Sequence, residues 1–157
     1  MQIKNIITIL ATFSSLCISG IAYCDDELSY DDTVDLIQKT MVGSASDVRM
    51  ESYGYIRFDK CSLDYKVSGT YPAGGLYDIK FSNIDFSSLN YKESSVGHDY
   101  TAFMMLNFKN AFQSKYDSKE ISIHTAVINV SNDEKAQILF QAFLHLGELC
   151  SAKKSSL

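Results

Sequence analysis

The chain has 157 residues, and its 19 Asp and Glu outnumber its 14 Lys and Arg, which gives a formal net charge of −5 at pH 7. This acidic balance argues against nucleic acid or an anionic membrane as the main partner. The length is that of one domain and no repeat interrupts it. We therefore expect a single domain over 25–157, with an ordered core over 29–150.

Residues 1–24 have the three-part layout of a secretory signal peptide. A positive start with Lys4 precedes an uncharged and mostly apolar run, and the small residues Ala22 and Cys24 stand just before an acidic pair. Two alternatives remain open. One is a retained transmembrane anchor, which the serines of the run disfavour, and the other is a lipid-modified Cys24, which the bulky Tyr23 disfavours. We expect an exported protein, periplasmic or secreted, with no stable membrane anchor after cleavage.

The first predicted element after this segment is a helix over 30–42. Ser29 and Asp32 have the spacing of a capping box, and Gly43 is a typical helix end. Apolar residues recur between them at helical spacing, namely Tyr30, Val34, Ile37 and Met41.

A run of strands is predicted in the middle of the chain. Asp59-Lys60 has the character of a tight turn, so the first two strands should pair antiparallel. The apolar parity changes at Ser82-Asn83, which predicts a bulge in the third strand. The strands are expected at 47–58, 61–67, 76–86, 100–109 and 120–130, with connections at 87–99 and 110–119.

A second capping box, formed by Ser131 and Glu134, begins a C-terminal helix predicted over 132–150. The order of elements predicts an α+β fold. It consists of an N-terminal helix, an antiparallel sheet of about five strands that can curl toward a half-barrel, and a C-terminal helix packed on the sheet.

Removal of the signal peptide leaves two of the four cysteines, Cys61 and Cys150. Cys61 shares its strand parity with the inward residues Leu63 and Tyr65, and Cys150 lies on the apolar face of the second helix. Because a cysteine pair in an exported domain is more often bridged than free, we predict a Cys61–Cys150 disulfide. Two buried thiols that merely pack are the alternative.

The sequence carries no convincing catalytic or metal-binding pattern. None of its three histidines has a partner at metal-ligand spacing, and nucleophile and phosphate-loop motifs are absent or stand in the wrong context. We expect no catalysis, no metal and no cofactor. The alternative is an enzyme whose catalytic residues are dispersed along the sequence.

The outward parity of the first strand is rich in residue types that are enriched at protein interfaces. This parity holds Arg49, Glu51, Tyr53, Tyr55 and Arg57. Tyr71 and Tyr77 flank the nearby Gly-rich loop. We predict that these tyrosines and arginines form a partner-binding face; the alternative is a face that covers the sheet beneath the first helix.

Export, small size, a disulfide and surface tyrosines favour a binding protein that acts by occupying a protein partner, as an inhibitor or an immunity protein does. The alternative is a carrier of a small ligand or lipid, with an apolar cavity between the sheet and the C-terminal helix. The candidate residues of this cavity are Phe103, Met104, Met105, Phe108, Phe140 and Phe143.

Overall fold

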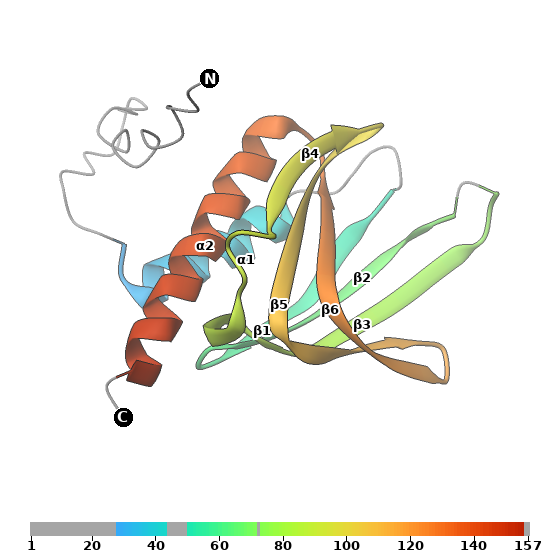
Figure 1. The fold of residues 1–157 in the computed structure, drawn as a ribbon. Coiled ribbons are helices and arrows are strands. Elements are labelled where there is room, and N and C mark those ends of the chain that lie inside the picture. The colour runs from blue at the N-terminus through green and yellow to red at the C-terminus, as the bar shows by residue number, and fades with distance from the viewer. Residues whose placement is uncertain (1–27, 44–49, 72, 156–157) are drawn as a thin grey trace, which may run out of the picture.

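The computed structural model describes residues 28–43, 50–71 and 73–155. Its elements in chain order are α1 (Tyr30–Val42), β1 (Ser52–Asp59), β2 (Ser62–Thr70), β3 (Leu76–Asp85), the 3₁₀ turn η1 (Phe86–Ser88), β4 (Ser95–Asp99), β5 (Thr101–Tyr116), β6 (Lys119–Val130) and α2 (Asp133–Ser155). Two helices lie together on one side of an antiparallel sheet (Figure 1), so the predicted α+β fold is confirmed. The predicted signal peptide over 1–24 and the predicted interface residue Arg49 lie outside the described residues.

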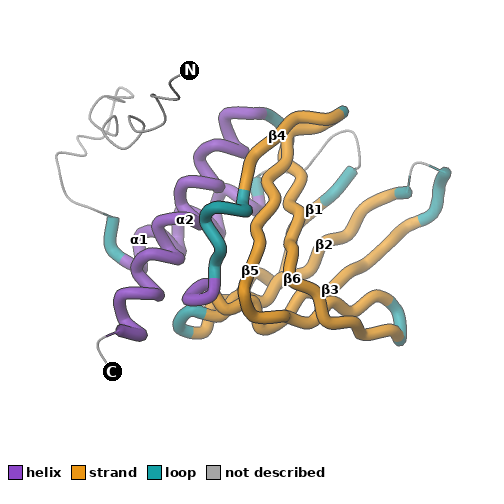
Figure 2. The backbone as a smooth tube through the Cα atoms, viewed as in Figure 1, coloured by secondary structure: helices purple, strands orange, loops and turns teal. Residues whose placement is uncertain are grey.

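The sheet is built around the long strand β5. One edge of β5 pairs with β6 along almost its whole length. The other edge pairs with β4 at the start of β5 and with β3 at its end, and β2 and β1 continue the sheet beyond β3. The strands curve around without closing into a barrel, and the ends of the β2–β3 and β5–β6 hairpins diverge on the side away from the helices (Figure 2).

Two predicted connections are strand instead, which corrects the expected count of about five strands to six in the described residues. The segment 87–99 contains β4, a five-residue strand that pairs only with the start of β5. The segment 110–119 extends β5 to Tyr116, and β6 begins at Lys119 after a turn in which Asp117 has φ 52°. Both segments are polar and partly exposed, so neither shows the apolar alternation by which a strand is recognised.

A bulge changes the facing of side chains within β1. The pairing with β2 shifts between Gly54 and Arg57, and Tyr55 adopts a φ of 51°. Before this shift Tyr53 is buried, and after it Phe58 is the partly buried, inward residue. The predicted parity of this strand is therefore wrong before the bulge and correct after it.

The predicted bulge in β3 is confirmed. Asn83 has φ 63°, and the pairing with β2 gains a residue between Phe81 and Ile84. Both of these apolar side chains are buried, although three positions separate them. The backbone N–H of Asn83 donates to Asp64 Oδ1 at 2.8 Å, which supports the bulged conformation.

The helices close one end of the curved sheet. α1 begins at the predicted cap, where the Ser29 hydroxyl accepts a hydrogen bond from the Asp32 N–H at 3.2 Å. In α2, Phe143 is fully buried and its ring stacks on that of Phe86 with centroids 5.3 Å apart and an interplanar angle of 9°. The Phe108 ring meets Phe86 edge-on at 5.4 Å, so this end is a dense aromatic core. No helix in the described ranges is long and apolar enough to cross a bilayer.

The predicted disulfide is confirmed. Cys61, in the turn between β1 and β2, is bonded to Cys150 near the end of α2, with the Cα atoms 5.7 Å apart. The bond joins residues separated by 89 positions, so it attaches the C-terminal helix to the start of the sheet. A disulfide of this kind fits an oxidising, extracytoplasmic location.

Candidate functional site

The end of the half-barrel opposite the helices is lined by inward tyrosines. Tyr65 from β2 is fully buried, and its ring stacks on Phe81 with centroids 4.8 Å apart. Tyr53 from β1 lies 6.1 Å from the Tyr65 ring, and Tyr77 from β3 is 8 % exposed. Together with Glu51, which precedes β1, these residues form what we call the tyrosine cluster: Glu51, Tyr53, Tyr65 and Tyr77.

The Tyr53 hydroxyl bridges the two ends of the open sheet. It donates to the backbone oxygen of Asn129 and accepts from the backbone N–H of the same residue, each at 2.9 Å. Asn129 belongs to β6, so one side chain of the first strand satisfies both polar groups that the last strand presents at this position. Burial, and next the charge of Glu51, raise the pKa of Tyr53 well above its usual range.

Glu51 is a carboxylate buried to 5 % exposure. The Tyr77 hydroxyl donates to Glu51 Oε1, while Oε2 has no hydrogen-bond partner. The hydroxyl of Tyr65 has none either, and these are the two unpaired buried side-chain atoms in the part of the chain that the structure describes. Burial, followed by the Glu51 charge, raises the pKa of Tyr65. Unpaired polar atoms are rare in protein interiors, so two in one cluster mark an unusual site.

Gly69 on β2 makes room for this arrangement. A Cβ at this position would lie 2.6 Å from the Tyr77 ring and 2.9 Å from Cγ of Glu51. Both side chains therefore pass directly over the Gly69 backbone, and any larger residue would displace them. Glycine here is required by close approach rather than by an unusual backbone angle.

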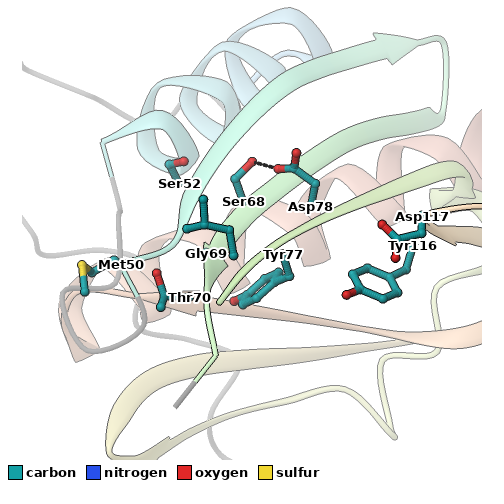
Figure 3. A pocket seen from close by; sticks show the side chains of 10 residues that line it. Met50, Ser52, Ser68, Gly69, Thr70, Tyr77, Asp78, Tyr116 and Asp117 are labelled. Carbon is teal, nitrogen blue, oxygen red and sulfur yellow. Dashed lines mark hydrogen bonds between the residues drawn. The ribbon is translucent and has the colours of Figure 1, made fainter. Parts of the chain in front are cut away.

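A hollow of about 300 Å³ opens beside Tyr77, the one member of the tyrosine cluster that lines it. We call it the open-end hollow. Figure 3 shows its residues, which come from the start of β1, the facing ends of β2 and β3, and the end of β5. Tyr77 and Gly69 line it, so the hollow and the buried carboxylate share a wall. Two aspartates, Asp78 and Asp117, and no basic residue line it. The Asp78 carboxylate accepts hydrogen bonds from Ser68 and from Lys66.

Large apolar and aromatic side chains surround this hollow at the surface. They form what we call the rim: Met50, Tyr71, Leu76 and Tyr116, exposed to 70 %, 41 %, 85 % and 37 %. The Tyr71 ring packs on Tyr77 at 4.9 Å, and a hydrogen bond with Tyr71 raises the pKa of Tyr116. The rim is therefore an ordered group of side chains and not a set of isolated exposed residues.

The structure divides the predicted partner-binding residues into three groups. Tyr53 and Tyr77 point inward. For Tyr53 this corrects the expected outward parity, and the cause is the bulge in β1. Tyr55 and Arg57 are exposed on the outer face, where Lys80 lies 5.1 Å above the Tyr55 ring. Tyr71 lies on the rim. Their role in binding a partner stays a prediction, but they do not form one continuous strip.

Glu51 is the functional residue of this site that the sequence does not reveal. Strand alternation predicts it on the outward face with Tyr53, and the bulge in β1 leaves both inward. A glutamate in a strand among tyrosines has no sequence signal for burial, because carboxylates are almost always exposed.

The residues predicted to line a carrier cavity are packed among their neighbours. Phe143 is fully buried against Phe86, while Phe103, Met105 and Phe140 are half-buried. The Phe103 ring lies against Gly97 of β4, where an added Cβ would be 2.7 Å away. None of these residues lines the open-end hollow or the second hollow described below. The cavity between sheet and helix stays a prediction.

A second hollow, of about 320 Å³, lies between β4 and the start of α2. Here His98 Nδ1 is 2.7 Å from Asp133 Oδ1, with both side chains more than half exposed. No serine, threonine or cysteine lines the hollow beside this pair. Over the described ranges, no group of three or more His, Cys, Asp or Glu could hold a metal ion. The arrangement is that of a surface ion pair rather than a nucleophilic site.

Comparisons of the chain with protein-family models, with curated proteins and with solved structures find nothing that matches it. The site is therefore interpreted from its own geometry.

Proposed function

We propose that this chain is an exported binding protein that attaches to a protein partner through the open end of its half-barrel. It would act by occupying that partner, as an inhibitor or an immunity protein does, and without catalysis. The observation that carries this proposal is the rim, in which Met50, Leu76 and Tyr116 line one hollow and Tyr71 packs beside it on Tyr77. Contiguous exposed apolar groups with tyrosines are typical of protein interaction sites.

Export is the second part of the proposal. It rests on the signal-like residues 1–24, and the Cys61–Cys150 disulfide supports it because such bonds persist in oxidising compartments. The same bond attaches α2 covalently to the start of the sheet, which limits rearrangement at the helix end. Preorganisation of this kind reduces the entropy that binding must overcome.

The chemistry of the open end favours a partner segment with apolar and basic character. The rim offers hydrophobic contact area, and the hollow beneath it is acidic. The chain as a whole carries a net charge of −5, which steers basic surfaces toward it. A protruding partner segment with a positively charged tip satisfies both features.

The test is capture of a partner from the exported fraction with the oxidised protein and two matched double variants. Leu76→Ser with Tyr71→Ser removes two rim side chains. Val127→Ser with Tyr100→Ser removes two exposed side chains of similar type elsewhere, at 47 % and 87 % exposure. We expect the rim variant to lose the captured protein at least tenfold and the control variant to retain it.

Equal capture by both variants would contradict the proposal. The carrier alternative predicts a different result, in which a small molecule rather than a protein is retained by the purified protein. The open-end hollow is at the lower limit of the roughly 300–1,000 Å³ of small-ligand sites. Mass spectrometry of the protein under native conditions separates the two outcomes.

A further inference from the structure

We propose that the buried Glu51 carboxylate and Tyr65 hydroxyl bind a primary ammonium group, which reaches them through the open-end hollow past Tyr77. We assign this group to a lysine side chain of the protein partner. The inference rests on the proposed function and deepens it, because it names the chemistry that the partner inserts.

The argument begins with the unpaired oxygen of Glu51. Oε1 accepts from Tyr77, so one side of the carboxylate is satisfied, while Oε2 is buried and has no donor. A buried carboxylate oxygen is unfavourable unless a donor or a positive charge reaches it. The described residues supply no hydrogen-bond donor to Oε2. A cation from outside the chain would therefore interact most favourably at this oxygen.

Tyr65 supplies a second unpaired atom in the same cluster. Its hydroxyl is fully buried and has no partner, and burial, followed by the Glu51 charge, raises its pKa. A hydroxyl oxygen can accept a hydrogen bond from an ammonium group that also donates to a carboxylate. Both unpaired atoms would be satisfied by one group with several N–H donors.

The type of cation follows from the number and kind of acceptors. One carboxylate and tyrosine hydroxyls are too few oxygen ligands for a calcium or magnesium ion. Aromatic rings attract organic cations, and Tyr53, Tyr65 and Tyr77 lie around the carboxylate. A compact ammonium with three donors fits a confined site better than the wide planar fork of a guanidinium.

Neither Glu51 nor Tyr65 lines the hollow, and Tyr77 separates the hollow from Glu51. An entering ammonium group therefore reaches the carboxylate by displacing the Tyr77 side chain. This side chain lines the hollow and donates to Glu51, and the absence of a Cβ at Gly69 lets it lie close to the β2 backbone. The hollow of about 300 Å³ is large enough for the four-carbon stem of a lysine. Long basic side chains bury such stems along apolar surface while their charged ends reach polar groups, and the rim supplies that surface.

The experiment is a titration of the isotope-labelled, oxidised protein followed by NMR, with Nα-acetyl-lysine N-methylamide as the probe. The norleucine derivative, which keeps the four-carbon stem and lacks the ammonium group, is the control probe. We expect saturable shifts at the amides of Glu51, Gly69 and Tyr77 with the lysine probe, and at least tenfold weaker binding of the norleucine probe. Equal binding of the two probes, or no saturable shift with the lysine probe, would overturn the assignment.

Two variants test the named atoms. Glu51→Gln keeps the shape and removes the charge, and we expect binding of the lysine probe to weaken at least tenfold. Glu120→Gln makes the same chemical change at an exposed position of β6 and should leave binding unchanged. If Glu51→Gln binds the probe as the wild type does, the proposal is wrong.

Tyr65→Phe tests the site even if Glu51→Gln does not fold. This variant deletes one unpaired oxygen atom and preserves the packed ring. We expect it to weaken the lysine probe threefold to tenfold and to leave the weak norleucine binding unchanged. Unaltered affinity for the lysine probe in a folded Tyr65→Phe protein would remove the hydroxyl from the site and contradict the proposal.

Failure of this site and failure of the proposed function give different results. A partner that is captured through the rim but equally well by Glu51→Gln leaves the function in place and overturns the lysine assignment. A lysine probe that binds as expected, with no partner lost in the rim variant, supports the ammonium site and overturns the proposed function.

Discussion

The two ends of the half-barrel are built from different chemistry. At the helix end, Phe86 stacks on Phe143 and a disulfide attaches α2 to the sheet. At the open end, a carboxylate and three hydroxyl groups are buried among aromatic rings, and two of their oxygens have no partner. The helix end has the composition expected where stability is the only requirement. The open end retains groups whose burial opposes folding, which is the pattern expected of a functional site.

The largest expected effect concerns the helix end. Replacing both Cys61 and Cys150 by serine removes a bond that closes a loop between residues 89 positions apart. The chain-entropy relation gives a loss of about 4.6 kcal/mol in the free energy of unfolding for a loop of this length. Urea unfolding of the double variant and of the oxidised wild type measures the difference. A loss below about 1 kcal/mol would show that packing of α2 alone holds this end together.

The next effect belongs to the open end and appears at alkaline pH. Burial and the Glu51 charge raise the pKa values of Tyr53 and Tyr65 above the unfolded value of about 10. A raised folded-state pKa means that the stability contributed by the neutral phenols is complete below pH 10 and is lost as the pH rises toward the folded-state values. The two groups together should reduce the free energy of unfolding by about 3 kcal/mol at pH 11.

Unfolding curves between pH 8 and pH 11 test this dependence, with phenolate absorbance as a second measurement. We expect two of the ten tyrosines to ionise only on unfolding. The double variant Tyr53→Phe with Tyr65→Phe should lose most of the dependence. A wild-type protein whose tyrosines all ionise while it remains folded would contradict the burial of the cluster.

A smaller effect is expected from Tyr53→Phe. This change removes a hydroxyl that makes two hydrogen bonds with Asn129 and leaves the N–H and C=O of that residue without their partner. Each hydrogen bond contributes about 1 kcal/mol, so we expect a loss of about 2 kcal/mol in unfolding free energy. Amide exchange at Asn129 should accelerate more than exchange elsewhere in β6.

The smallest effect, and one of opposite sign, is expected from Tyr65→Phe. The ring stays in its stack with Phe81, and the deleted hydroxyl has no partner to lose. Removing an unpaired buried polar atom should stabilise the protein by up to about 1 kcal/mol. A clear destabilisation would mean that the Tyr65 hydroxyl has a structural role, and the contrast between the two neighbouring tyrosines would then disappear.

The sequence predicted the helix end better than the open end, for a physical reason. α1 carries the predicted cap Ser29, and α2 carries helical periodicity, although Asn132 rather than the predicted Ser131 accepts the capping hydrogen bond from the Lys135 N–H. The pair Cys61 and Cys150 predicts the bond that joins α2 to the sheet. These signals are local or depend on residue type alone. The bulge at Ser82-Asn83 was also predictable, because it reverses an otherwise clear apolar parity.

The open end depends on a feature that leaves no such trace. The bulge in β1 places Tyr55 at φ 51°, a conformation that tyrosine rarely adopts, and it turns Glu51 and Tyr53 inward. Without the bulge the tyrosines of this strand form an exposed strip, which is the face that the sequence predicts. Composition alone predicts that tyrosine-rich segments bind a partner. It does not predict the rim and the hollow, because these are formed by segments that meet only in the folded protein.

The most direct test of the division between the two ends is a footprint of the captured partner by amide hydrogen exchange. We expect the partner to slow exchange at residues 50–53, 68–71, 76–78 and 114–117, around the open-end hollow, and to leave α1 and α2 unchanged. Slowed exchange confined to the helices or to β4 would contradict the assignment of binding to the open end.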